Sequence, residues 1–503
     1  MRLPACFLLL LLLTACTPAQ AAMTDPPPPP LSLVTVDPNA SATPTPFQPA
    51  SPSDTPLPSP TLVPPSETPP PTTDTPPATG RTQYTFYVNL DYAGRSLTAD
   101  ETIRYSNTTG QSLSEIVLAV EPNLSQGAFV LNALGQDNVT LTSYDLTGHR
   151  MSISLPQPLQ PGSSTTLALN FTLNIPPKHY EKTFGYLGYQ VNLSDWYPFI
   201  VPFVNGAWVL HDPWAFGEYL VYDSSDFEVN LKVNDPSVVV AASAPAEANG
   251  EWTRYRLYGA RTFVLSASDR FQFVESAVGS AVIRVYYLDG YDGAAQGMLN
   301  AAVQAVALYA VKFAPYPYDS LSVVQADVPD GQEYDGLVFL STKFFAEYGG
   351  SAKSNLISIG VHEIAHQWWF GLVGNDQAIE PWLDEAMATY SENIFYKFNH
   401  PTYGDWWWNF RVNYFGANGW VDSSVYQMAN FQTYVSAVYM DGASFLRDLN
   451  VRMGDDDFYR FLKDYAATYS RSRVTTFDFF ATLRKDTSAD ISDLIQTYFQ
   501  GSY

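Results

Sequence analysis

An alternation of apolar and polar residues marks the chain from residue 84 to about 275. Segments such as YTFYVNLDY (84–92) and FEVNLKVND (227–235) place an apolar side chain at nearly every second position, and Gly, Asn, Asp and Pro separate the segments. This period of two is that of strands buried on one face. We therefore predict an N-terminal antiparallel β-sandwich or saddle-like domain over residues 82–275.

The pattern changes after a last strand-like segment, AVIRVYYLDG at 281–290. Residues 294–315 show helical spacing, and a strand–loop–strand pattern follows over 321–341. Another helix is predicted over SNLISIGVHEIAHQWWFGLV (354–373), and helical segments continue from there. The chain is thus predicted to be an α+β multidomain protein whose second folded domain, mainly helical, covers 276–503.

The first sixteen residues have the pattern of a secretory signal peptide. An apolar run from Phe7 to Leu13 follows a single Arg and is too short to span a bilayer. The run ends in LTAC, which resembles the lipobox of bacterial lipoproteins. That resemblance implies that Cys16 carries a lipid as the first residue of the mature chain. The alternative is a simple signal peptide, residues 1–16, that happens to end in Cys.

Composition separates the signal from the folded part and limits the partners. Residues 17–81 hold 21 of the 38 prolines, many Ser and Thr, and one aromatic residue, so we predict a disordered tether. The formal net charge of the chain is −24. Nucleic-acid binding requires clustered Lys and Arg, so this charge argues against such a partner.

Two of the six histidines lie in VHEIAHQWW, at 361–369. His362 and His366 are four residues apart, which places them on one face of a helix where both can bind one ion. Two imidazoles and a carboxylate leave a fourth, tetrahedral position for water on a zinc ion. Glu363, beside the first histidine, is placed to take a proton from that water. The alternative is a helix whose two histidines are satisfied by ordinary polar contacts.

A third ligand is expected from the next helix. Glu380 and Pro381 in EPWLDEAMATY have the pattern of a helix start, and Glu385 lies in the first turns. The short turn-rich link GNDQAI allows the two helices to fold back on each other. Asp384 points elsewhere on the helix and is given no ligand role.

H-E-x-x-H followed by eighteen residues and Glu resembles the gluzincin zinc aminopeptidases, the family of membrane alanyl aminopeptidase and leukotriene hydrolase. The resemblance is strongest over 330–500. It implies a thermolysin-like catalytic domain with one Zn²⁺ per chain, held by His362, His366 and Glu385. It also implies that Glu363 is the catalytic base.

Two acidic residues extend the resemblance. Glu392 lies two helical turns after Glu385, where it can accept the outer N–H of a zinc-bound histidine; the alternative is a solvated helix-face glutamate. Glu333 in DGQEYDGLVFL falls where the family has the Glu that binds the substrate's free α-amine. Gln332 and Tyr334 replace the family's Met and Asn, and the alternative is an exposed turn residue.

A tyrosine completes the predicted site. The family places a Tyr before Lys-Gly on a later helix, and AVYMDGASFLRDL has Tyr439 there, with Asp441 in place of Lys. A phenol O–H can donate to the oxyanion of a tetrahedral intermediate. After His366 the sequence has only His400, so a tyrosine donor is favoured over the histidine of thermolysin-like endopeptidases.

The preferred interpretation is a zinc metallopeptidase, an aminopeptidase that acts on peptides and is anchored to a bacterial membrane as an extracytoplasmic lipoprotein. We expect a short form without the family's large C-terminal helical domain, and hence a more open cleft. Two alternatives are kept: a zinc endopeptidase on the same scaffold, and a non-catalytic binding lipoprotein.

Overall fold

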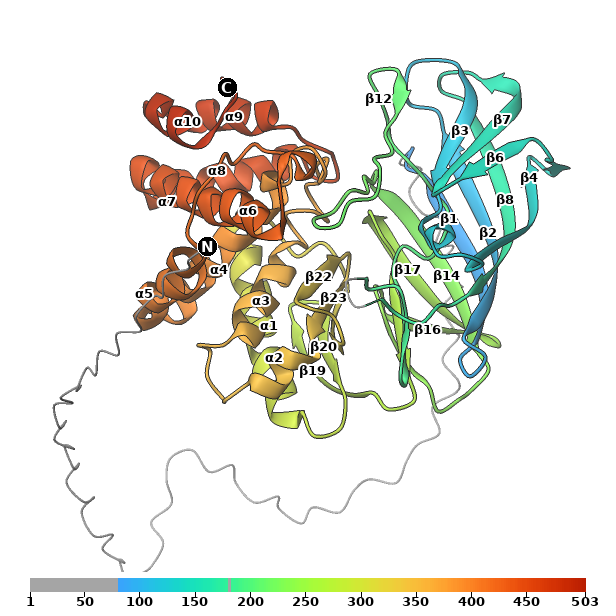
Figure 1. Ribbon diagram of the computed structural model, residues 1–503, viewed down its shortest axis with the longest axis horizontal. Helices are drawn as coiled ribbons and strands as arrows, with labels where there is room; N and C mark the ends of the chain where they lie inside the picture. Colours follow the sequence, from blue (N-terminus) through green and yellow to red (C-terminus); the bar gives the residue numbers. More distant parts are fainter. Residues whose placement is uncertain (1–79, 180–181) are drawn as a thin grey trace, which may run out of the picture. The chain divides into compact units, whose positions relative to one another are not determined.

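The computed structural model describes residues 80–179 and 182–503. The predicted signal peptide, the lipidated Cys16 and the tether up to residue 79 lie outside the described residues. The first strand, β1 (Gln83–Asp91), begins one residue after the predicted start of the folded part at 82 (Figure 1).

The N-terminal domain is built of β-strands, as predicted, and its largest sheet has eight strands. In sheet order these are β16 (Ala246–Asn249), β17 (Trp252–Ala260), β14 (Ser225–Val233), β1, β2 (Ser96–Ser106), β8 (Ser164–Asn174), β4 (Phe129–Gln136) and β5 (Val139–Thr140). Buried and exposed residues alternate along β2, as the period of two requires. The sheet is not purely antiparallel, because β1 pairs with β14 in parallel across a long connection.

Smaller sheets share the core of this domain. One four-stranded sheet has the order β15 (Val239–Ala242), β18 (Leu265–Ser268), β10 (Gln190–Leu193) and β9 (Gly185–Leu187). Another has the order β11 (Phe199–Ile200), β3 (Leu113–Ala119), β7 (Arg150–Leu159) and β6 (Tyr144–Thr147), and β12 (Phe203–Val204) pairs with β13 (Ala207–Trp208). Trp196, fully buried between β10 and β11, packs on Phe86 of the large sheet with ring centroids 5.1 Å apart.

The second domain begins with a five-stranded sheet. Its order is β19 (Gln272–Val278), β20 (Ala281–Tyr287), β21 (Ser320–Ala326), β23 (Leu337–Ser341) and β22 (Gly331–Tyr334). The predicted boundary at 275/276 therefore falls inside β19, which pairs with β20 and belongs to the second sheet. The predicted loop within 321–341 contains the edge strand β22, which runs antiparallel to β23.

Helices form the rest of this domain (Figure 1). They are α1 (Asp292–Lys312), α2 (Thr342–Glu347), α3 (Asn355–Ala365), α4 (Trp382–Asn399), α5 (Gly404–Trp407), α6 (Phe431–Tyr434), α7 (Gly442–Met453), α8 (Asp455–Thr468), α9 (Thr476–Asp486) and α10 (Ser492–Tyr498), with π-helical turns at Trp408–Asn413 and Val435–Asp441. Helix α3 packs between α1 and α4. Among the described residues, α1 has the length and apolar composition of a membrane span, but half of its most apolar window is buried in this fold.

Helix α3 is shorter than the predicted helix over 354–373. It ends at Ala365, and the chain then turns so that Gly371 N–H donates to the carbonyl of His366. Gly371 has no room for a side chain, because a Cβ there would lie 2.9 Å from Oδ1 of Asp335. The apolar pattern thus continues beyond the helix into a turn that packs closely against the segment after β22.

Candidate active site

Three side chains from α3 and α4 converge on one point. Nε2 of His362 lies 3.2 Å from Nε2 of His366 and 3.2 Å from Oε2 of Glu385, and the third side of the triangle is 3.4 Å. Ligand atoms about 2.0–2.1 Å from a tetrahedral zinc ion lie about 3.3 Å from one another. The triangle therefore has the dimensions of one face of a zinc site.

The orientation of both imidazoles also fits a metal. Nδ1 of His366 lies 2.9 Å from the carbonyl oxygen of Trp369, and Nδ1 of His362 lies 3.0 Å from Oε1 of Glu392. A carbonyl and a carboxylate only accept hydrogen bonds, so each Nδ1 carries the proton and each Nε2 faces the centre of the triangle. Burial alone would lower the pKa of His362, but hydrogen bonds to Glu385 and Glu392 raise it to about 9.

Glu392 is fully buried, so it is not a solvated helix-face residue. Besides His362 it accepts hydrogen bonds from Nε and Nη2 of Arg411, both at 2.9 Å, from Nε1 of Trp407 at 2.9 Å and from Oγ of Ser358 at 2.6 Å. Burial opposes ionisation, but the charge of Arg411 outweighs it and lowers the pKa of Glu392 to about 2. The side chain is thus a carboxylate that fixes the His362 ring.

Glu363 lies beside the triangle and faces β22. It is 5% exposed, and a Cβ on Gly331 would lie 2.2 Å from its Oε1, so the Glu363 side chain as placed packs directly against Gly331. Burial raises the pKa of Glu363 to about 8, against the lowering effect of His362 and His366. A carboxyl group that gains and loses a proton near neutral pH suits acid–base catalysis.

Glu333 lies on the edge strand and is 5% exposed, so the exposed-turn alternative is wrong. Its Oε2 accepts a hydrogen bond from Gln332 at 2.8 Å, and its Oε1 accepts one from Gln377 at 3.1 Å. Gln332, which replaces the Met of the family, also donates to Oε1 of Glu218 at 3.3 Å. Burial raises the pKa of Glu333 and, together with the negative charge of Glu333, that of Glu218.

Glu218 is a site residue that the sequence analysis missed. It comes from the loop before β14 in the N-terminal domain, and Glu218, Glu333 and Glu385 each offer an oxygen within 4.8 Å of the others. The available signal was an acidic residue inside the apolar run PWAFGEYLVY (213–222). Arg411 was missed as well, because nothing in its local sequence marks a partner of Glu392.

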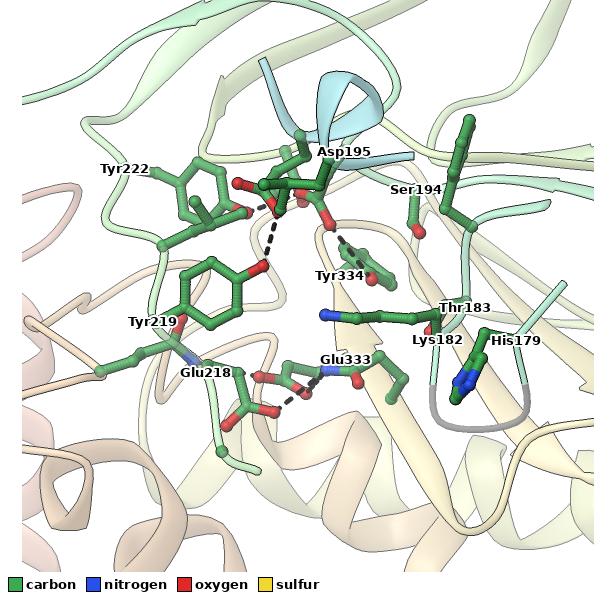
Figure 2. A pocket seen from close by; sticks show the side chains of 18 of the residues that line it. His179, Lys182, Thr183, Ser194, Asp195, Glu218, Tyr219, Tyr222, Glu333 and Tyr334 are labelled. Carbon is green, nitrogen blue, oxygen red and sulfur yellow. Dashed lines mark hydrogen bonds between the residues drawn. The ribbon is translucent and has the colours of Figure 1, made fainter. Parts of the chain in front are cut away.

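A cavity of 220 Å³ borders Glu218 and Glu333. Figure 2 shows the Lys182 side chain extending into it, between these two residues and Asp195. The hydroxyl of Tyr222 donates to Oδ1 of Asp195 at 2.6 Å, and burial raises the pKa of Asp195 to about 7. The cavity is thus lined by charged, hydroxyl and apolar groups, most of which come from the N-terminal domain and β22.

Tyr439 lies in the π-helical turn before α7. Its ring stacks on that of His362, with centroids 5.9 Å apart and planes 8° apart. Burial, with the charge of Glu385, raises the pKa of the phenol well above its usual value, so Tyr439 stays protonated and can donate a hydrogen bond. The structure therefore brings all seven predicted active-site residues to one place, while their chemical roles remain predictions.

Comparison with known proteins agrees with this geometry. Residues 298–498 match the model of the Peptidase family M1 domain. The chain is 25% identical to Aminopeptidase M1-B of Oryza sativa subsp. japonica over 246 residues, which are 45% of this chain and 28% of that protein. It is 22% identical to Probable aminopeptidase 2 of Sulfurisphaera tokodaii over 247 residues, 46% of this chain and 31% of the relative. The chain thus spans less than a third of these two relatives.

The fold is also that of a solved structure. An M1 zinc metallopeptidase from Deinococcus radiodurans superposes with a TM-score of 0.62 at 18% identity, covering 84% of this chain and 94% of that one. At this identity the likeness shows the fold alone. The predicted order of a β-rich N-terminal domain and a mainly helical second domain is confirmed.

Proposed function

We propose that the chain, whose residues 298–498 match the model of the Peptidase family M1 domain, is a zinc-dependent aminopeptidase of the gluzincin family. The observation that carries the proposal is the recess of Glu218, Glu333 and Glu385. It places two additional carboxylates within 4.8 Å of a predicted metal ligand. A metal site for hydrolysis needs only the triangle, whereas these carboxylates add a site for a cation next to the scissile bond.

A zinc ion held by His362, His366 and Glu385 would supply Lewis acidity for the scissile carbonyl and for the attacking water. Glu363 takes a proton from that water, and its raised pKa suits the later transfer of the proton to the leaving amine. The Tyr439 O–H donates to the oxygen that becomes negative in the tetrahedral intermediate. The His362 ring is kept in place by Glu392.

Glu333 and Glu218 bind the substrate's α-ammonium in this proposal. An ammonium group taken from water into a buried recess needs carboxylate partners, since an unpaired buried charge costs several kcal/mol. A blocked N-terminus would leave the carboxylates without a cation. The proposal thus favours an exopeptidase over the endopeptidase alternative, in which Glu333 binds no amine.

The proposed location is the outer side of a bacterial membrane. It rests on the lipobox-like LTAC, which would make Cys16 a lipidated residue, and on the proline-rich composition of residues 17–81. Replacing Cys16 with Ser should leave the protein soluble or unprocessed in its host, and mass spectrometry should detect the lipid on the wild-type cysteine. Identical fractionation of both forms, with Cys16 unmodified, would contradict the anchor.

The experiment that tests the enzymatic proposal compares one peptide with a free and with an acetylated N-terminus, with and without a chelator. Wild type should cut the free form far faster and lose this activity on chelation. Glu333→Ala should lower kcat/KM for the free form by about 30- to 5,000-fold, the usual loss for a close charge pair. Equal rates on both forms, or an unchanged ratio in Glu333→Ala, would support the endopeptidase instead.

A further inference from the structure

An aromatic cluster connects the proposed active site with the protein surface. We call it the aromatic wall; its members are Trp214, Phe216, Phe431 and Tyr434. Ring centroids are 5.7 Å apart between Phe216 and Tyr434 and 6.5 Å apart between Phe216 and Phe431. Phe431 is 54% exposed and Trp214 is 39% exposed. The wall therefore offers apolar surface that this fold leaves partly uncovered.

The aromatic wall lies next to both groups that would bind the substrate's N-terminal residue: the proposed donor to its carbonyl oxygen and the proposed partners of its amine. At one end, the ring of Tyr434 lies 5.5 Å from that of Tyr439, the proposed donor to the carbonyl oxygen. At the other end, a Cβ on Gly217 would lie 3.1 Å from Oη of Tyr434, so the chain next to Glu218 passes directly along Tyr434. The wall thus extends from the carbonyl end of the site to the amine end.

The covalent structure of the substrate determines where the side chain of its N-terminal residue lies relative to the aromatic wall. The amine and the carbonyl of an N-terminal residue are attached to the same Cα, which must lie between Glu218 and Tyr439. Its side chain projects from that point, beside Tyr434 and Phe216. We propose that the aromatic wall binds the side chain of the substrate's N-terminal residue and selects large apolar, above all aromatic, side chains. This inference rests on the proposed aminopeptidase function.

The cavity of Figure 2 is the competing place for that side chain. It borders Glu218 and Glu333, and its lining combines charged groups with apolar residues. Its lining, within the described part of the chain, includes neither Tyr434 nor Tyr439. The cavity therefore adjoins the amine end alone, whereas the aromatic wall adjoins both ends, and the wall is the better match to a side chain on the Cα between them.

The test measures kcat/KM on free peptides X-Ala-Ala, with Phe, Leu, Ala or Arg at X. Wild type should prefer Phe and Leu over Ala by about 10-fold or more, the usual discrimination of an apolar pocket. Phe216→Ala and Phe431→Ala should each reduce the Phe-to-Ala ratio several-fold. The matched control is Phe477→Ala on α9, an aromatic residue that is 67% exposed, and it should leave the ratio unchanged.

Introducing a carboxylate into the aromatic wall gives a second test, because a change in substrate preference cannot be explained by a loss of protein stability. Phe431→Glu should shift the preference toward Arg at X, because the side chain would then meet a carboxylate. The same variants should hardly change the order of rates on Ala-X-Ala peptides, where X lies on the leaving side. A shift there instead would assign the wall to the leaving peptide and overturn the inference.

The outcomes separate this inference from the function on which it depends. If wild type needs a free amine but cuts all four X-Ala-Ala peptides equally, or if the Phe216 and Phe431 variants keep the wild-type ratio, the aromatic wall is structural packing only. If wild type releases no N-terminal residue from any peptide, the proposed function itself fails.

Discussion

At the residue scale, the chemistry depends on a division of roles between adjacent side chains. His362 presents Nε2 to the triangle, whereas Glu363 faces Gly331 on β22. Neighbouring residues on a helix point about 100° apart, so one short motif can supply both the proposed ligand and the proposed base. Burial is the main cause of the raised pKa values of Glu363, Glu333 and Glu218, and the negative charges of neighbouring carboxylates add to it.

Replacing the base should separate metal binding from turnover. Glu363→Gln should keep stoichiometric zinc and lose turnover by about 10²- to 10⁴-fold, because an amide cannot take the proton. His366→Ala, by contrast, should lose the metal itself. Elemental analysis and single-turnover rates on the same samples measure both. Zinc loss in Glu363→Gln, or full activity with zinc retained, would show that the residue is not the base.

Glu101, far from the site, makes the stability of the N-terminal domain pH-dependent. It is 1% exposed, and neither oxygen has a hydrogen-bond partner among the described residues. Burial raises the pKa of Glu101 well above its usual value in the folded state. The folded protein therefore holds this proton more tightly than the unfolded chain, so its contribution to stability falls as the pH rises above the unfolded pKa of about 4.3.

Glu101→Gln replaces the carboxyl group that binds this proton with an amide that does not titrate. We expect the variant to gain stability relative to wild type as the pH is raised from 4 toward 8, since the amide cannot ionise. Thermal unfolding of both proteins across this range measures the difference. A difference in Tm that is constant with pH would mean that the Glu101 carboxyl is not the group responsible.

At the element scale, the parts that sequence patterns predicted well are those with local causes. Helical period and a fixed spacing bring His362, His366 and Glu385 onto facing helices, and Pro381 marks the start of α4. The end of α3 was placed too late because the apolar pattern continues through the buried turn that follows Ala365, and burial alone does not distinguish such a turn from a helix. Glu218 and Arg411 were missed because their partners are distant in sequence, and no period marks them.

One contact between elements holds the strand that carries Glu333, the proposed partner of the substrate's amine, against the end of α3. Gln367, the first residue after His366, is 1% exposed; it accepts a hydrogen bond from Gly336 N–H at 2.8 Å and donates to the Tyr334 carbonyl at 2.9 Å. It thereby ties the end of α3 to the edge strand that carries Glu333. The distance between the metal triangle and Glu333 depends on this tie.

Gln367→Ala should loosen the tie. Two buried backbone groups lose their partners, at about 1–3 kcal/mol each, so the free energy of unfolding should fall. KM for a free peptide should rise and the preference for free over acetylated peptide should narrow, while zinc content stays the same. Gln296→Ala, at an exposed position on α1, is the control. Lower stability with an unchanged preference would make Gln367 a purely structural residue.

At the scale of the whole molecule, the active site belongs to two domains, because Glu218 comes from the β-rich domain and the metal triangle from the helical one. Arg261, 3% exposed, is one of the side chains that link them. Its guanidinium donates to the carbonyls of Tyr222 at 2.9 Å, Phe370 at 2.6 Å and Ser472 at 2.6 Å. These carbonyls lie in the loop that follows Glu218, the turn after α3 and the link between α8 and α9.

Arg261→Lys should therefore affect both stability and substrate binding. A lysine cannot reach three carbonyls in one plane, and each one left unpaired should cost about 1–3 kcal/mol of unfolding free energy. Because the loop bearing Glu218 loses its attachment to the turn behind His366, KM for free peptides should rise more than kcat falls. Arg452→Lys, which changes an exposed pair with Asp493, serves as the control. If Arg261→Lys unfolds like wild type and keeps its KM, Arg261 does not position the loop that bears Glu218. Other polar links between the domains, such as His211 with Asp376 and Arg473 with Asp223, would then suffice together with the aromatic packing of Phe216.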